Sequence, residues 1–135
     1  MDNTSTVQSI YAAFGRGDVP AILAHLQVRV AWEQWQDHSA QKAGVPWLAA
    51  RNGPAEAVAF FAVLSTMKFR HFQVLSLMAG GNQVAAEIQF EAELAGGAIL
   101  RDEEMHLWTF DGDGKVTRFR HYADTHKHMR AAGVA

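Results

Sequence analysis

The sequence predicts an α+β domain in which helices cover one face of a curved, mostly antiparallel sheet. The first half of the chain carries mainly helical patterns, and the second half carries four long strand-like runs. The loops between these runs are too short for the crossover that a parallel pair requires. With 135 residues, of which 49% are apolar and 19% charged, the chain is long enough for one hydrophobic core. We therefore expect a single domain over residues 1–135.

Three helical segments are expected before the long strands. Apolar residues at helical spacing predict a first helix that ends at Gly15. Asp18 is placed to cap a second helix, so the two segments form a hairpin. A third helix begins at Asn52 or Gly53 and ends near Lys68.

The strands are predicted from period-two alternation and from the turns between them. A short strand over Val28–Glu33 follows the helix hairpin, and residues 34–52 form a loop over the pocket mouth. Asp124 caps a short C-terminal helix that follows the last strand. The four long strands are separated by glycine-rich turns and are expected at Phe69–Met78, Gln83–Leu94, Ile99–Phe110 and Lys115–Ala123.

Charge and composition exclude several classes of partner. The net charge of −2 and the scattered basic residues leave no stripe that would hold a phosphate backbone. Neither a basic leader nor an apolar run of membrane-spanning length is present, so we expect a soluble, cytoplasmic protein without a membrane partner. The chain has no cysteine, which rules out thiol nucleophiles and thiolate metal ligands.

Two stretches of the chain carry a family pattern. The first is VQSIYAAFGRGD at residues 7–18, and the second runs from EMHLWTF at residues 104–110 through GKV to RHYADT at residues 120–125. Together they resemble the nuclear transport factor 2-like superfamily, most closely its SnoaL-like and ketosteroid-isomerase-like branch. The resemblance extends from about Val7 to Arg130 and implies a cone-shaped fold around one internal small-molecule pocket. It leaves the activity open, because one fold carries unrelated functions.

The catalytic sets of two related enzyme groups have no counterpart in this chain. A ketosteroid isomerase needs an Asp base, a Tyr and a protonated Asp, and the matching positions here hold Gln34, Ile10 and Met105. Limonene epoxide hydrolase uses an Arg and two Asp, and those positions hold Ile88, Phe90 and His121. SnoaL-like polyketide cyclases use a His on the penultimate strand and an Asp on the last strand. This chain keeps the His as His106 and has His121 in place of the Asp.

The final hairpin is expected to bring three polar residues onto the inner face of the sheet. If Phe110 faces Lys115 across the turn, Glu104 lies opposite His121, and alternation adds His106 to the same face. A Glu beside a His favours the imidazolium, so these three residues are candidates for proton transfer near neutral pH. The predicted apolar wall of the pocket consists of Trp32, Ile88, Phe90, Trp108 and Phe119.

Other interpretations of the polar residues stay open. A Glu and a His on adjacent strands are often only a structural pair. Two His and one Glu on one face can also hold iron or zinc, although relatives do not usually bind metal and we expect neither metal nor cofactor. Asp37 and His38 are expected to be solvated loop residues. His126 and His128 stand two apart on the last helix, and we expect them to face solvent.

Two functions follow from this pattern. One is a cofactor-independent isomerase or cyclase that moves a proton next to the carbonyl of an apolar substrate. The other is a non-catalytic module that binds a small apolar molecule in the same pocket. In both cases we expect a homodimer formed by the outer face of the sheet, where apolar side chains would otherwise meet water: Met105, Leu107, Val116 and Tyr122.

Overall fold

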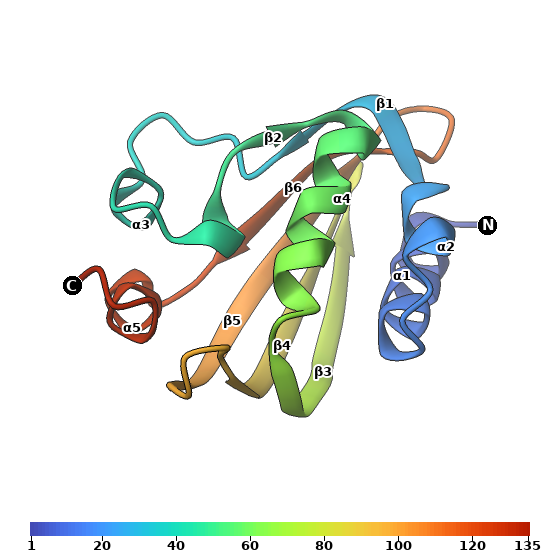
Figure 1. The fold of residues 1–135 in the computed structure, drawn as a ribbon. Coiled ribbons are helices and arrows are strands. Elements are labelled where there is room, and N and C mark those ends of the chain that lie inside the picture. The colour runs from blue at the N-terminus through green and yellow to red at the C-terminus, as the bar shows by residue number, and fades with distance from the viewer.

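The structure is a computed structural model that describes residues 1–135, and it consists of one six-stranded sheet with helices against one face (Figure 1). The α+β class and the expected order of helices and strands are confirmed. None of the helices is both long and apolar enough to span a bilayer. The elements are α1 (Asn3–Gly15), α2 (Val19–Leu23), β1 (Leu26–Trp32), α3 (Ser39–Lys42), the 3-10 helix η1 (Pro46–Leu48), β2 (Arg51–Asn52), α4 (Gly53–Leu64), β3 (Lys68–Gly80), β4 (Gln83–Glu93), β5 (Ile99–Phe110), β6 (Val116–Tyr122) and α5 (Thr125–Ala131).

Short polar side chains begin several of the helices. Asp2 accepts a hydrogen bond from the backbone of Ser5, so α1 starts earlier than its apolar spacing suggested. Asp18 caps α2 and Asp124 caps α5 in the same way, as predicted from the sequence. At the start of α4, Gly53 has a φ of +75°, and a Cβ there would lie 3.0 Å from the carbonyl oxygen of Val28. Only glycine fits this junction without strain.

The sheet has the strand order β2-β1-β6-β5-β4-β3. The last four strands pair antiparallel along the chain, as predicted, and β1 pairs antiparallel with β2. The one parallel pair joins β1 to β6, and most of the chain connects these two strands. The sheet curves, and α4 lies across its inner face, with the α1–α2 hairpin on one side and α3 and α5 on the other (Figure 1).

The register of the final hairpin differs from the prediction. His106 lies opposite His121 and Trp108 opposite Phe119, so the expected pairing of Glu104 with His121 is wrong. Phe110 pairs with Val116 rather than Lys115 at the turn, which moves the register by one residue, and a bulge after Thr109 inserts one extra residue into β6, which moves it by a second. His121 still points to the inner face of the sheet, because the pairing has moved by two residues rather than one.

The same bulge moves one residue that was expected on the outer face. Val116 and Phe119 are three residues apart, yet both point inward, and Val116 is fully buried. A bulged strand no longer alternates strictly, which explains how Val116 reaches the core. Of the predicted outer patch, Met105, Leu107 and Tyr122 remain on the outside of the sheet.

Residues 34–52 form a structured wall rather than an open loop. His38 caps α3 by accepting the backbone N–H of Gln41 on Nδ1, and Asp37 pairs with Lys42 at the surface. Trp47, in η1, is buried against the end of the molecule that carries α5. The expectation of a loop over the pocket mouth is therefore corrected: this segment closes one end of the interior.

Candidate functional site

A cavity of about 70 Å³ lies between the helices and the inner face of the sheet. Sixteen of its twenty lining residues are hydrophobic, among them Trp32, Phe90, Trp108 and Phe119 of the predicted wall. Ile88 is fully buried but belongs to the surrounding core instead of the lining. The four polar lining residues are Glu104, His106, His121 and His128, so the three candidates from the last hairpin do meet in the cavity.

A directional hydrogen-bond chain fixes His106 in one tautomer. The indole N–H of Trp108 donates to the hydroxyl of Tyr11 at 3.0 Å, and this hydroxyl lies 2.7 Å from Nδ1 of His106. Nε2 of His106 lies 2.7 Å from Oε1 of Glu104 and donates to it if the carboxylate is ionised. Nδ1 then accepts a hydrogen bond from the Tyr11 hydroxyl. Both ring nitrogens of His106 are thus occupied, which leaves no free nitrogen for a ligand.

Burial and the neighbouring charges set the protonation states of this chain. Burial alone would raise the pKa of Glu104, but the hydrogen bond from His106 and the positive charge of His121 lower it to about 2. Burial lowers the pKa of His106, and the nearby His121 charge adds to this effect. Burial also raises the pKa of the Tyr11 hydroxyl far above its usual range. We conclude that near neutral pH Glu104 is a carboxylate, while His106 and Tyr11 are uncharged.

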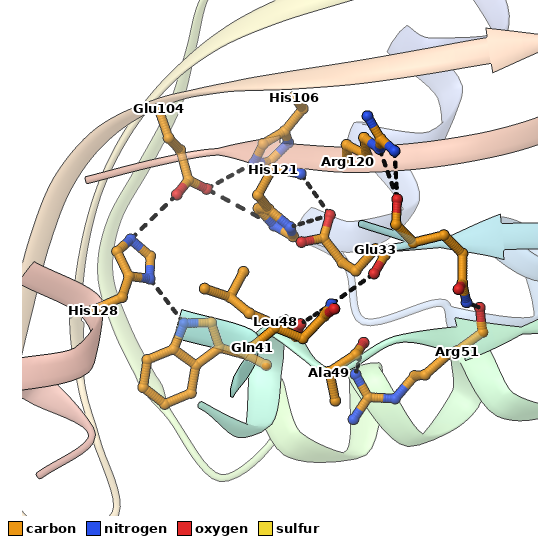
Figure 2. Close-up of polar contacts among 12 residues, drawn as sticks. Glu33, Gln41, Leu48, Ala49, Arg51, Glu104, His106, Arg120, His121 and His128 are labelled. Atoms are coloured by element: carbon orange, nitrogen blue, oxygen red, sulfur yellow. Dashed lines mark hydrogen bonds and ion pairs between the residues drawn. The ribbon is translucent and has the colours of Figure 1, made fainter. Parts of the chain in front are cut away.

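His121 lies between two carboxylates (Figure 2). Its Nδ1 is 3.3 Å from Oε1 of Glu33, and its Nε2 is 3.9 Å from Oε1 of Glu104. Burial alone would lower the pKa of His121, but the nearby negative charges of Glu33 and Glu104 outweigh this and raise it. The result is a buried imidazole that favours its charged form and lines the cavity.

Glu33 is the residue of this site that the strand alternation did not predict. It directly follows Trp32 at the end of β1, yet both side chains are fully buried. Its backbone has a φ of +54°, a left-handed conformation that is rare outside glycine and costs about 1–3 kcal/mol. The conformation is held by two hydrogen bonds, from the backbone N–H of Glu33 to Phe119 at 2.9 Å and from the side chain of Gln41 to the Glu33 carbonyl at 2.7 Å.

His128, on the C-terminal helix α5, belongs to the same buried polar group as Glu104, His106 and His121. The expectation that it faces solvent is therefore wrong. The indole N–H of Trp47 donates to Nδ1 of His128 at 2.8 Å, so the ring proton must sit on Nε2. Nε2 lies 2.7 Å from Oδ2 of Asp102 and 3.5 Å from Oε2 of Glu104. His128 is buried because α5 folds back against β5, whereas His126 stays exposed.

Several polar atoms of this buried group have no hydrogen-bond partner. They are Oε2 of Glu33, Oε2 of Glu104 and Nδ1 of His121, whose 3.3 Å contact with Glu33 lacks good geometry. An unsatisfied buried polar atom costs about 1–3 kcal/mol, which a ligand with matching polar atoms would recover. Two of these residues, Glu104 and His121, line the cavity.

Two overlapping groups come close enough to hold a metal ion. They are Glu104 with His106 and His121, and Asp102 with Glu104 and His128, with one ligand atom per residue and all such atoms within 4.8 Å of one another. His128 fits a metal poorly, because the Trp47 N–H on Nδ1 keeps a proton on Nε2. In the first group, the 2.7 Å contact between His106 and Glu104 is a normal length for a charge-assisted hydrogen bond.

Comparison with known proteins assigns this chain to a family. The model of the SnoaL-like domain matches residues 7–119. No match is found among curated protein sequences. Among solved structures, a nuclear transport factor 2-like protein of unknown function from Burkholderia pseudomallei K96243 has a TM-score of 0.79 at 22% identity, with 98% of each chain covered.

Two further structures share the fold. TerC, co-crystallised with polyporic acid, has a TM-score of 0.77 at 24% identity, with 97% of this chain and 98% of that chain covered. A candidate polyketide cyclase from Xanthomonas campestris pv. campestris has a TM-score of 0.72 at 22% identity, with 96% of each chain covered. The family model covers well over half of the chain, and the resemblance expected from the two sequence stretches is confirmed. The chain belongs to the SnoaL-like family, and it shares the fold of nuclear transport factor 2-like structures.

Proposed function

We propose that the cavity binds a small, mostly apolar carbonyl compound and that His121 and Glu104 transfer a proton at the carbon next to its carbonyl. The observation that carries this proposal is the position of His121, which lines the cavity between Glu33 and Glu104 with no hydrogen bond on either ring nitrogen. A charged imidazole with a free N–H is a suitable donor to a carbonyl oxygen.

The reaction step uses the two cavity side chains that have polar atoms without a hydrogen bond, His121 and Glu104. Nε2 of His121 donates a hydrogen bond to the carbonyl oxygen, which stabilises the negative charge that develops there. Oε2 of Glu104, which has no hydrogen-bond partner, accepts the proton from the adjacent carbon as the C–H bond breaks. The electron pair of that bond forms a carbon–carbon double bond, and the carbonyl π pair moves onto the oxygen, which gives an enolate held by His121. Return of the proton to another carbon gives isomerisation. Attack of the enolate carbon on a second carbonyl gives cyclisation, and the proton held by Glu104 then passes to the new alkoxide oxygen.

The neighbouring polar residues His106 and Glu33 hold Glu104 and His121 in place. His106 fixes one oxygen of Glu104, while Glu33 accepts the backbone N–H of His121 at 2.5 Å and favours the charge on its ring. The candidate polyketide cyclase and the TerC complex with polyporic acid, both of this fold, support a small-molecule cavity. A cytoplasmic location and the absence of a cofactor remain predictions.

Deuterium exchange tests the proposal without knowledge of the natural substrate. We expect the protein to speed exchange of the α-protons of a small methyl ketone in D₂O, followed by ¹H NMR. His121→Gln should reduce this rate at least tenfold, a normal loss for removal of a positioned general acid. His126→Gln, which changes an exposed histidine of α5, is the matched control and should leave the rate unchanged.

A binding module without catalysis is the second candidate, and one observation favours it. The pKa of Glu104, lowered to about 2, makes this carboxylate a weak base unless a ligand separates it from His121. If ketone binding depends on His121 but exchange never exceeds the rate in solution at any pH, the protein is a binding module and the proposed catalysis is wrong.

A further inference from the structure

The inner cavity is too small for a large substrate. Its volume of about 70 Å³ has room for about five to seven water-sized groups, since one such group needs about 10–15 Å³. The charged and polar side chains Glu104, His121 and His128 lie on its walls. A carbonyl with a few carbon atoms fills this space, so any larger part of a ligand must lie elsewhere.

A larger groove of about 740 Å³ adjoins the cavity. It lies between the C-terminal half of α1, the end of α4 and the start of β3, and it shares seven lining residues with the cavity. Of the shared residues only Tyr11 contacts the polar residues of the cavity, through its hydroxyl beside His106. The groove therefore adjoins the apolar part of the cavity and does not reach Glu104, His121 or His128. The shared residues are Tyr11, Phe14, Ile22, Phe61, Leu64, Phe69 and Phe72.

The boundary between the two spaces is aromatic. Phe14 lies 5.0 Å from Phe72 and 5.6 Å from Phe69, measured between ring centroids, and all three rings are only partly buried. A partly exposed ring can change its side-chain rotamer, and such a change would open a passage between the two spaces. The outer groove itself is lined beyond them by small residues of α1, including Ala12 and Gly15.

The charges at the rim do not favour an ionic ligand in the groove. Its one cationic lining residue, Arg70, is already paired with Glu91 and Glu93 on the neighbouring strand. An apolar, uncharged chain is therefore the ligand chemistry that suits this surface.

We propose that the substrate is an elongated carbonyl compound whose carbonyl end passes Phe14, Phe69 and Phe72 to reach His121, while an uncharged apolar chain occupies the outer groove. This inference rests on the proposed function for its carbonyl end. The groove sets the preferred chain length, because each additional methylene buries more apolar surface until the groove is full.

The test uses methyl ketones whose alkyl chain is lengthened from ethyl to octyl, with affinity measured by calorimetry. We expect affinity to increase by up to about fourfold for each methylene that becomes fully buried. Ala12→Trp fills the groove and should remove this increase while the ethyl ketone still binds as in the wild type. Gln8→Trp is the control, since residue 8 is also exposed on α1 but does not line the groove.

Each outcome has a separate meaning. Affinity that does not depend on chain length, or a dependence that Ala12→Trp leaves intact, overturns the inference. Length-dependent binding that Ala12→Trp removes supports it. If that binding is seen while no ketone of the series undergoes exchange, the proposed catalysis fails and the elongated ligand site stands.

Discussion

Oε1 of Glu33 accepts the backbone N–H of His121 at 2.5 Å and also lies 3.3 Å from Nδ1 of the same residue. One carboxylate oxygen thus contacts both the main chain and the ring of a residue 88 positions later in the sequence. Glu33 therefore determines both where His121 lies and which charge it carries.

Replacement of Glu33 by Gln should separate these two effects. The amide oxygen still accepts the backbone N–H, but the negative charge is lost, so we expect the pKa of His121 to fall. The ketone exchange rate, which needs the charged ring, should then decline at a lower pH than in the wild type. NMR titration of the His121 ring measures the shift. Glu103→Gln, on the exposed face of β5, should leave the titration curve in place, and an unchanged curve in Glu33→Gln would contradict the assigned role.

Folding stability should depend on pH through His121. Its pKa is raised in the folded state above the ordinary value of 6.5, so its contribution is fully present below that value and is lost as pH rises through the folded pKa. His106 acts in the opposite direction, because its pKa is lowered, and its contribution is lost as pH falls through its folded pKa. Urea titrations should show the stability difference between wild type and His121→Gln shrinking as pH rises. A difference that stays constant or grows would refute the raised pKa.

His128 should matter for stability rather than only for ligand binding. His128→Leu leaves Oδ2 of the buried Asp102 carboxylate without its hydrogen bond, and we expect a loss of about 3 kcal/mol in the free energy of unfolding. His126→Leu, on the exposed side of the same helix, should change it by no more than about 0.5 kcal/mol. Equal effects from the two variants would mean that α5 is not docked through His128.

The outer face of the sheet predicts association of two chains. Met105 and Leu107 are partly buried there, and Tyr122 is 43% exposed. We expect light scattering at micromolar concentration to give the mass of a dimer, and Leu107→Glu to give that of a monomer. Leu75→Glu, at an exposed position on the edge strand β3, serves as the control and should remain dimeric. A wild-type monomer would remove this prediction.

Alternation along β5 was enough to predict the inner face of the site. Glu104, His106 and Trp108 stand two residues apart on an unbroken strand, so burial of one requires burial of the others. The register with β6 was not predictable, because the bulge after Thr109 depends on how β6 fits against the core and has no clear local signal. The prediction that His121 lies on the inner face held only because the pairing moved by an even number of residues.

The missed residues lie where regular structure ends. Glu33 points inward through a single left-handed backbone conformation, and no pattern in the sequence marks a glutamate for φ of +54°. His128 and Trp47 are brought together by the folding back of α5, a tertiary contact between residues 81 apart. A histidine on a short terminal helix is usually exposed, so the general expectation was opposite to the result.

The docking of α5 has a practical meaning for work with the protein. Trypsin cleaves after lysine, and Lys127 of α5 is half-exposed. Cleavage of the bond between Lys127 and His128 would detach His128 from the chain. Slow loss of the C-terminal peptide in a limited digest would report a closed interior, and faster loss would report a loosened one. Because Trp47 donates to His128, its fluorescence should change as the peptide leaves, so the digest and the emission spectrum can be followed in the same cuvette.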